Sequence, residues 1–346
     1  MKNLILIALG LTLISLSSYA STHIAQAKIV KGDVSYLPPG AKTAKKLKKS
    51  TRLYKDTSIY VNGKGFAKIK FINSSFITVG PNSKVVLEMD MKDKTSLVNL
   101  MSGKIRALVD KNKKNDKKFL VRTSSATMGV RGTEFQVSFT PKAKKTSLLT
   151  YDGRVDMKKS NVSDVKANDV AKMKSSLAND PTPVKKGDFL RIAQSDNAKS
   201  EKVKINPKQF VLMKKDESLG AEKVKLTKAD KKAIKSEAKK LEKEFKEELA
   251  MSDNKETKNL GYVDFDKGVY IPPVDAKKKK FLGKVSADGR YIPPKGVVVD
   301  AQKGLVLKAK ASDKIKRFVE DVNKKNQVPK TIRQDSQKAY ERYFDV

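Results

Sequence analysis

The side chains that most often perform covalent chemistry in enzymes are scarce in this sequence. It contains no Cys and a single His, His23, and it has neither a Gly-x-Ser-x-Gly motif nor a phosphate-binding loop. Carboxylate pairs occur at Asp264 with Asp266 and at Glu88 with Asp90, but strand alternation would place each pair on one solvated face. We therefore expect no catalytic residue, no metal ligand and no cofactor, and we predict that the protein is not an enzyme.

Arg131 is the side chain with the best claim to recognise a ligand, since Gly129 and Gly132 lie close on either side of it. One interpretation makes Arg131 a contact to a carboxylate or to the charge of a polymer. The other is structural: the two glycines permit a tight backbone corner, Thr133 bonds to local backbone and Arg131 pairs within the fold. The structural interpretation is favoured, and Arg131 stays as the candidate ligand contact.

A short repeat near the C-terminus is a second candidate for recognition. Each copy pairs an Asp-containing turn with the sequence Tyr-Ile-Pro-Pro. Proline cannot donate a backbone hydrogen bond inside a sheet, so we expect extended arms that lie over a surface, either of the same chain or of a partner, or else a linker. The predicted docking residues are Tyr270, Ile271, Pro272, Pro273, Tyr291, Ile292, Pro293 and Pro294.

Most of the N-terminal half is expected to fold into short strands, which would position the residues named above that lie within it. Apolar and Lys residues alternate from Ala67 to Phe71, which is the period of a half-buried strand. Similar alternation recurs as far as Met157, with Gly and Asn turns between the runs and a tight-hairpin signal at Asp152-Gly153. Short strands at even spacing predict a mainly β domain, built as a sandwich, a barrel or a short stacked β-coil. A helical and extended, partly irregular C-terminal region is expected to follow it.

Three sequence blocks occur in a fixed order along these strands, ahead of the Asp152-Gly153 hairpin. They are Gly80-Pro81-Asn82-Ser83, Leu100 with Gly103, and Arg131-Gly132-Thr133 with Phe135. In this order and spacing they resemble the FecR family of bacterial envelope domains. The resemblance implies a β-rich module outside the cytoplasm and no enzymatic activity. We expect structural roles for the motif residues Gly80, Pro81, Asn82, Ser83, Gly103, Gly132, Thr133, Phe135 and Gly153.

FecR-like proteins that couple iron uptake to transcription carry a cytoplasmic tail and a membrane span ahead of this domain. The sequence shows neither, so we expect an exported, standalone module without the anti-sigma tail. Lys2, an apolar run over 4–16 and the Ser18-Tyr19-Ala20 end are typical of a secretory signal peptide, cleaved after Ala20 or at the alternative site Ala25-Gln26-Ala27. The run is shorter than the roughly 20 residues that a membrane-spanning helix needs. The expected location is periplasmic or secreted, in a bacterium.

Changes of composition divide the chain into five segments. They are a signal peptide over 1–20, a FecR-like β domain over 24–215 with its core at 59–157, a charged amphipathic helix over 221–252, the two-copy repeat over 260–300, and a C-terminal helix and tail over 310–346. Apolar residues of the charged helix recur at three- and four-residue intervals after a Thr227 N-cap. This helix could be a coiled-coil arm or could lie on the β domain, and its apolar stripe of about two heptads favours the second alternative.

The chain is strongly basic, with 75 Lys and Arg against 38 Asp and Glu and a formal charge of +37. Such a charge attracts polyanions, but the Lys residues are dispersed and Arg is rare, whereas base and phosphate recognition favours Arg. Nucleic acid is therefore not the expected partner. We predict a cell-envelope module that binds a protein or an anionic envelope or wall polymer through its β domain, with peripheral membrane association allowed. The alternatives are a charge-driven binder of lipopolysaccharide, wall polymer or nucleic acid, and a periplasmic signalling component that acts through a separate membrane partner.

Overall fold

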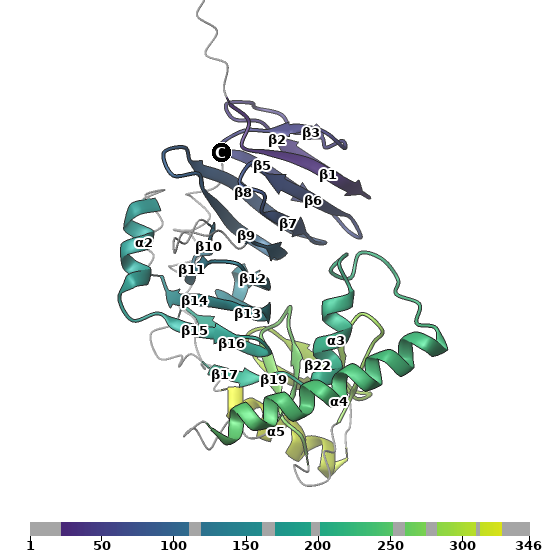
Figure 1. Ribbon diagram of the computed structural model, residues 1–346. Coiled ribbons are helices and arrows are strands. Elements are labelled where there is room, and N and C mark those ends of the chain that lie inside the picture. Colours follow the sequence, from purple (N-terminus) through teal and green to yellow (C-terminus); the bar gives the residue numbers. More distant parts are fainter. Residues whose placement is uncertain are drawn as a thin grey trace, which may run out of the picture.

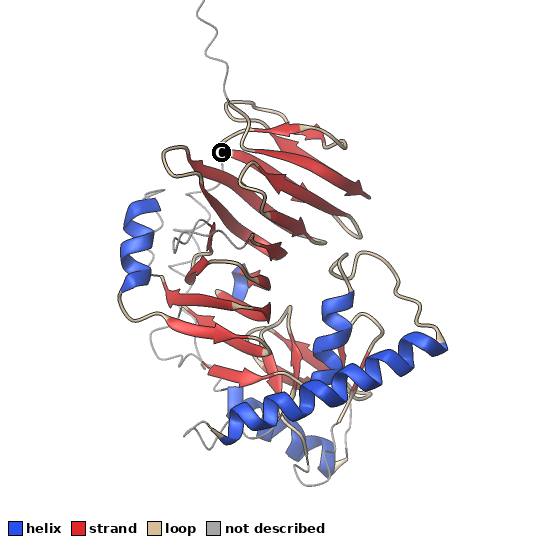
Figure 2. Cartoon of the chain, in the orientation of Figure 1, coloured by secondary structure: helices blue, strands red, loops and turns tan. Residues whose placement is uncertain are grey.

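The computed structural model describes residues 22–110, 119–160, 170–194, 201–251, 260–274, 282–308 and 312–326. Strands hold 44% of the residues and helices 22%, so the fold is mainly β, as the sequence predicts. Figures 1 and 2 show the strand-rich N-terminal part, with the helices and small hairpins of the C-terminal part beyond β16 and β17. The predicted signal peptide over 1–20 lies outside the described residues, as does the tail over 327–346.

Two sheets packed face to face form the strand-rich part. Sheet A has the strand order β4 (Arg52–Leu53), β1 (Ala25–Lys31), β6 (Phe66–Phe71), β7 (Phe76–Val79), β9 (Thr95–Leu108), β12 (Glu134–Thr140), β13 (Lys145–Asp152), β16 (Asp188–Ala193) and β17 (Glu201–Lys204). Sheet B has the order β3 (Lys45–Lys46), β2 (Val34–Leu37), β5 (Thr57–Val61), β8 (Ser83–Asp90), β9, β10 (Phe119–Arg122), β11 (Ala126–Val130), β14 (Arg154–Lys159) and β15 (Thr182–Lys185). All these pairings are antiparallel except β9 with β10. Of the three predicted architectures, the structure is a sandwich.

The long strand β9 joins the two sheets because its backbone turns at Gly103. Its first half pairs with β8 of sheet B up to Ser102, and from Gly103 onward it pairs with β12 of sheet A. Gly103 has φ +83°, and a Cβ atom there would come within 2.3 Å of the Ser83 Oγ atom. Only glycine combines that backbone with so close an approach.

The main core lies between the sheets and is filled by the inward side chains of both. Phe71, Phe119 and Phe135 form an edge-to-face row through it, with ring centroids 5.7 and 6.5 Å apart. On β6 the apolar side chains are buried while Lys68 and Lys70 are partly exposed, which is the alternation that the sequence predicts. The turn after β12 is a short 3-10 helix, η2 (Pro141–Ala143).

Helices and hairpins cover the outer faces of the sandwich. Outside sheet B, α2 (Val170–Ala178) packs on Leu97 and Leu120. Outside sheet A, side chains of β13, β16 and β17 pack against the C-terminal part. That part consists of α3 (Pro207–Lys215), α4 (Lys228–Ala250), the hairpins β18–β19 (Tyr262–Asp264, Val269–Ile271), β20–β21 (Lys284–Val285, Tyr291–Ile292) and β22–β23 (Val297–Asp300, Gly304–Leu307), and α5 (Asp313–Asn326).

Helix α4 lies on the sandwich and does not project as a free arm. It begins with a capping box in which Thr227 and Asp230 bond each other's backbone N–H groups. Its buried stripe runs from Ile234 to Leu249 and packs into the cluster outside sheet A. Phe245 lies directly on Gly187, where a Cβ atom would stand 2.2 Å from the ring. The helix therefore extends the fold of the sandwich instead of reaching away from it.

Both Tyr-Ile-Pro-Pro copies begin in the second strand of a hairpin that docks on the same chain. Tyr270, Ile271 and Tyr291 are buried in the C-terminal clusters, whereas Ile292 keeps 38% of its surface exposed. Asn326, at the end of α5, exchanges hydrogen bonds with the backbone of Tyr270 at 2.9 and 2.8 Å. In the structure, these segments therefore cover a surface of their own chain, which is one of the alternatives expected from the sequence.

A third hairpin of the same kind, β22–β23, was missed in the sequence because it lacks the Tyr-Ile-Pro-Pro segment. Its turn, Asp300–Gly304, nevertheless repeats the Asp-x-x-Lys-Gly pattern of Asp264–Gly268 in the first hairpin. In both turns the Asp carboxylate accepts from the backbone N–H of the Lys three residues later, at 2.7 and 3.0 Å. The Asp-x-x-Lys-Gly turn was thus the signal for this copy.

Candidate binding site

The FecR-like motif residues lie in turns and in the core. The Gly80–Ser83 segment connects β7 to β8, and Ser83 Oγ accepts the N–H of Lys104 at 2.8 Å. Asn82 has φ +54°, and its side-chain oxygen accepts from the N–H of Gly63 at 3.2 Å. These contacts hold the turn against the point where β9 passes from sheet B to sheet A. The motif residues of this turn thus contribute to the stability of the fold.

The second group of motif residues forms the corner between β11 and β12. Thr133 Oγ1 lies 2.9 Å from the carbonyl oxygens of both Arg131 and Arg154, and Gly132 has φ +57°. Gly153 turns the neighbouring hairpin with φ +77°, and Phe135 is fully buried in the core. The Arg131 side chain is exposed at this corner and lines neither of the two cavities described below.

The carboxylates expected on solvated faces lie in less open places. Glu88 retains only 4% exposure, the amide of Asn99 donates to it, and burial raises its pKa. The expectation was wrong for Glu88 because the outer face of sheet B is covered here: Asn99 on β9 and Arg122 on β10, the next two strands of the sheet, are also buried. Alternation of residue types identifies the two faces of a strand but does not show that either face is exposed to solvent.

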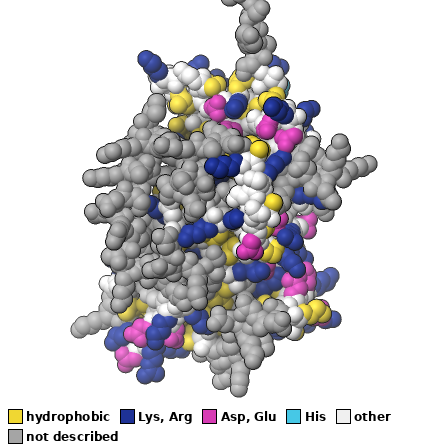
Figure 3. Space-filling view, turned by 90° about the vertical axis from the view of Figure 1, so that its left-hand side faces the viewer, with side chains coloured by type: hydrophobic (Ala, Val, Ile, Leu, Met, Phe, Trp, Pro, Cys, Tyr) yellow, Lys and Arg dark blue, Asp and Glu magenta, His cyan; other side chains and the backbone are white. Residues whose placement is uncertain are grey.

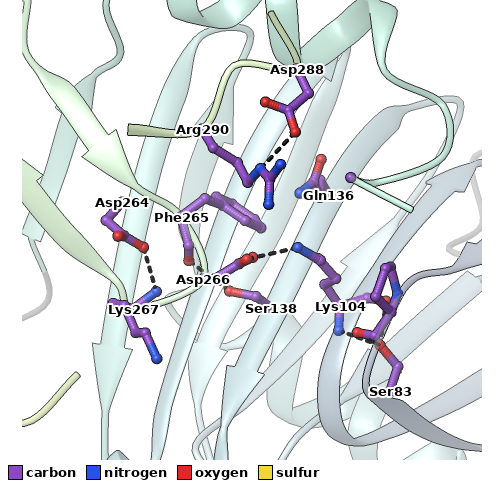
Figure 4. A network of polar contacts seen from close by, with 12 residues as sticks. Ser83, Lys104, Gln136, Ser138, Asp264, Phe265, Asp266, Lys267, Asp288 and Arg290 are labelled. Atoms are coloured by element: carbon purple, nitrogen blue, oxygen red, sulfur yellow. Dashed lines mark hydrogen bonds and ion pairs between the residues drawn. The ribbon is translucent and has the colours of Figure 1, made fainter. Parts of the chain in front are cut away.

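A cavity of about 140 Å³ lies where the first two hairpins meet α3 and the outer face of sheet A. We call it the junction cavity, and Figure 4 shows its polar network. Asp266 pairs with Lys104 at 2.7 Å, and Asp288 pairs with Arg290 at 2.6 Å. Asp216 accepts from the backbone N–H of Gly220 at 2.6 Å. Each of these carboxylates thus already has a partner within the chain.

Side chains beside the junction cavity also anchor the first hairpin to the sheet. Ser138 and Thr140 on β12 donate their hydroxyls to the carbonyls of Phe265 and Asp266, both at 2.8 Å. Beside them, burial and the nearby charge of Asp266 raise the pKa of Asp264 to about 6. The network therefore holds the hairpin tip in place, and its charged groups are used for that purpose.

A second and larger hollow, of about 920 Å³, runs between α4, α3 and the first two hairpins. We call it the α4 groove. Its apolar lining consists of Pro207, Leu212, Leu226, Ile234, Ala238, Leu260, Tyr262, Pro273, Val285 and Ala287. Its polar lining consists of Lys208, Lys231, Lys235, Lys239, Lys246, Glu242, Asn206 and Ser286. The groove is thus an apolar trough with a basic rim.

Helical spacing explains why Lys and apolar residues share this face of α4. Lys231, Lys235 and Lys239 follow one another at intervals of four, with Ile234 and Ala238 next to them at the same interval. The two rows therefore run side by side along the helix. On the facing wall, Asn206 caps α3 by accepting a hydrogen bond from the backbone N–H of Lys208 at 3.0 Å. This bond fixes the position of Lys208 in the first turn of α3.

The rim of the α4 groove carries positive charge that the described part of the chain does not neutralise. Lys246 pairs with Glu242 at 2.9 Å. Lys208, Lys231, Lys235 and Lys239 form no ion pair with any described residue, and all four are exposed. This contrasts with the junction cavity, where the carboxylates are paired. The α4 groove is therefore the candidate site for an external anionic partner.

Sequence reasoning found the apolar stripe of α4 but not the groove. The stripe identifies Ile234 and Ala238, whereas Leu226, Leu260 and Val285 come from three separate segments that only the fold brings together. The spacing of Lys231, Lys235 and Lys239 was the available signal. It marks a basic edge on one side of the stripe.

Within the described ranges, no group of three or more His, Cys, Asp or Glu side chains is arranged to hold a metal ion. No helix in the same ranges is both long and apolar enough to cross a bilayer.

Comparison with known proteins identifies one family along part of the chain. Residues 57–156, less than a third of the 346-residue sequence, match the model of the family described as FecR protein. No curated protein matches the chain.

Solved structures give weaker likenesses. Two crystal structures of a "putative anti-sigma factor" from Parabacteroides distasonis ATCC 8503 match with 12% and 14% identity and TM-scores of 0.35 and 0.34. Each match covers 46% of this chain and 64% or 65% of the other, less than two thirds of its length. A "Cell surface anchoring domain" matches with 18% identity and a TM-score of 0.18, over 19% of this chain and 84% of its own.

Proposed function

Since residues 57–156 are a FecR domain, we propose that this protein is a non-catalytic module of the bacterial cell envelope that binds an anionic partner in the α4 groove. The β sandwich acts as the scaffold, and the C-terminal helices and hairpins supply the binding surface. In this proposal the FecR-like domain extends over 24–215, and the segments over 221–252, 260–300 and 310–346 belong to the binding part. An exported protein cleaved after Ala20 would present this surface outside the cytoplasm.

One observation carries the proposal: four exposed lysines that have no carboxylate partner among the described residues border an apolar trough. Figure 3 shows a face on which Lys and Arg side chains are scattered, with Asp and Glu side chains between them. The α4 groove differs because its lysines are aligned by the helix and border an apolar floor. Such a site supports recognition through charge and burial together.

Two triple variants test this proposal with matched changes of charge. Lys231→Gln, Lys235→Gln and Lys239→Gln together remove the groove rim on α4, and Lys228→Gln, Lys232→Gln and Lys240→Gln remove the same charge from the part of α4 outside the groove. We expect the wild type and the second triple to retain the same anionic component from an envelope extract, less of it at high salt, and the first triple to lose it. Equal retention by both triples would refute the groove as the site.

A signalling role is the second candidate, and the FecR domain itself favours it. In that case the module acts through a separate membrane protein. Deleting the gene and measuring transcription genome-wide would show a regulon that the wild-type gene restores, and an unchanged transcriptome would count against signalling.

A further inference from the structure

We propose that the occupant of the α4 groove is a single molecule of an anionic phospholipid, with its acyl chains in the trough and its phosphate at the lysine rim. This inference rests on the proposed function, because it names the chemical class of the partner for the same site. The dimensions of the trough, the chemistry of its floor and the placement of its charges carry it.

The length of the trough suits acyl chains that lie along the helix. Groove-lining residues on α4 extend from Lys231 to Lys246, which at 1.5 Å per residue is a length of about 22 Å. Two acyl chains can therefore lie lengthwise beside α4.

The floor of the trough favours acyl chains over an extended peptide. Ile234 and Leu212 are only 2% and 3% exposed, and the partly buried side chains beside them, Leu226, Leu260 and Val285, are also apolar. A strand laid on this surface would turn backbone N–H and C=O groups toward side chains that cannot bond them, which is unfavourable. Acyl chains carry no such groups.

The positions of the lysine side chains at the rim suit the phosphate group of a lipid. Lys231, Lys235 and Lys239 follow one edge of the trough on α4, and Lys208 stands on α3. A phosphate that accepts from one or two of these ammonium groups leaves its acyl chains free to enter the floor. A purely ionic polymer would use the rim and leave the apolar floor uncovered, so it accounts for only half of the site.

Soluble short-chain lipids provide the test, because they act as monomers and separate a single-molecule site from adsorption to a bilayer. The probes are dihexanoyl and dioctanoyl phosphatidylglycerol below their critical micelle concentrations, with dioctanoyl phosphatidylcholine as the zwitterionic control. Titration calorimetry with the mature chain gives the affinities. We expect saturable binding with one lipid per chain, and an affinity about tenfold or more higher for the longer anionic lipid, since each buried methylene adds to it.

The triple variants and a filled groove then locate the site. The Lys231→Gln, Lys235→Gln, Lys239→Gln variant should weaken binding of dioctanoyl phosphatidylglycerol by about tenfold or more, and the Lys228→Gln, Lys232→Gln, Lys240→Gln variant should leave it nearly unchanged. Ala238→Trp should block the trough while the rim stays intact, and a circular dichroism melt checks that this variant folds.

The outcomes separate the two proposals. Retention of an extract component that depends on the groove lysines, without any lipid binding, would overturn the phospholipid inference and leave the proposed function standing. Equal affinity for the two chain lengths would also overturn the inference, since it would mean that the headgroup alone is bound. Equal behaviour of the two triples in both assays would overturn the inference and the proposed function together.

Discussion

Gly103 lies where β9 passes from one sheet to the other, and its backbone determines whether that passage is possible. Its left-handed φ and the contact with Ser83 leave no room for a side chain. Ser83 in turn bonds the backbone of Lys104, so the two motif positions work as one corner. At the residue scale, the motif is therefore explained by the geometry of the sandwich.

Replacing Gly103 tests this explanation directly. Gly103→Ala forces a Cβ atom against Ser83 and Asn82 in a left-handed conformation, so we expect it to lower the free energy of unfolding by about 3 kcal/mol or more. Gly63→Ala is the matched control, since Gly63 also has positive φ but has nothing within 4 Å of the added Cβ. It should cost about 1 kcal/mol. Urea denaturation measures both, and equal losses would contradict the steric argument.

Asp264 gives a prediction about pH. An unfolded Asp has a pKa of about 3.9. Burial and Asp266 raise the folded-state pKa of Asp264 to about 6. The folded state holds this proton more tightly, so the contribution of Asp264 to stability is present below pH 4 and is lost as the pH rises through 6.

Asp264→Asn keeps the oxygen that accepts from Lys267 and removes the charge. We therefore expect it to raise the free energy of unfolding at pH 8 by roughly 1–3 kcal/mol and to change it little at pH 4. Asp110→Asn, at an exposed position, is the control and should give the same small change at both pH values. Equal effects of Asp264→Asn on the free energy of unfolding at both pH values would show that burial does not destabilise the charged form of this carboxyl group.

At the element scale, Gln209 on α3 joins the first two hairpins. It is fully buried, its amide donates to the carbonyls of Val263 at 2.7 Å and Gly289 at 2.9 Å, and its oxygen accepts from the N–H of Val263 at 2.9 Å. Gln209→Ala leaves those backbone groups unpaired, so we expect a loss of about 2–4 kcal/mol in urea denaturation. Gln302→Ala removes one exposed bond to Lys142 and should cost less than about 1 kcal/mol. Similar costs for the two variants would mean that the hairpins are not held through α3.

The same scale shows what the sequence could and could not predict. Strand alternation around Ala67–Phe71 predicts a half-buried sheet because one side of each strand meets the core. The apolar stripe of α4 predicts a packed helix for the same reason. The groove escapes prediction because Leu226, Leu260 and Val285 are distant in sequence and each is unremarkable alone. The buried state of Glu88 escapes because it depends on what covers the sheet from outside.

At the scale of the whole molecule, the C-terminal part completes the sandwich and adds a surface to it. The outer face of sheet A is occupied by the chain's own hairpins and by α3. Phe210 on α3 contacts Tyr151 on β13 and Phe245 on α4, with ring centroids 5.5 and 5.8 Å apart. The formal charge of +37 is spread over the chain, and only in the α4 groove does the described structure combine aligned, unpaired lysines with an apolar floor. The described part of the molecule thus combines a scaffold with the groove that we propose as its recognition surface.

Hydrogen–deuterium exchange of the mature chain, with and without saturating dioctanoyl phosphatidylglycerol, tests the central claim that the α4 groove is the binding site. We predict slower exchange confined to α4, the start of α3, the strands β18 and β20 and the turn that follows β20, with the β sandwich unchanged. The Lys231→Gln, Lys235→Gln, Lys239→Gln variant should lose that protection. Protection that falls on the sandwich around Arg131, or that survives in this variant, would contradict the account.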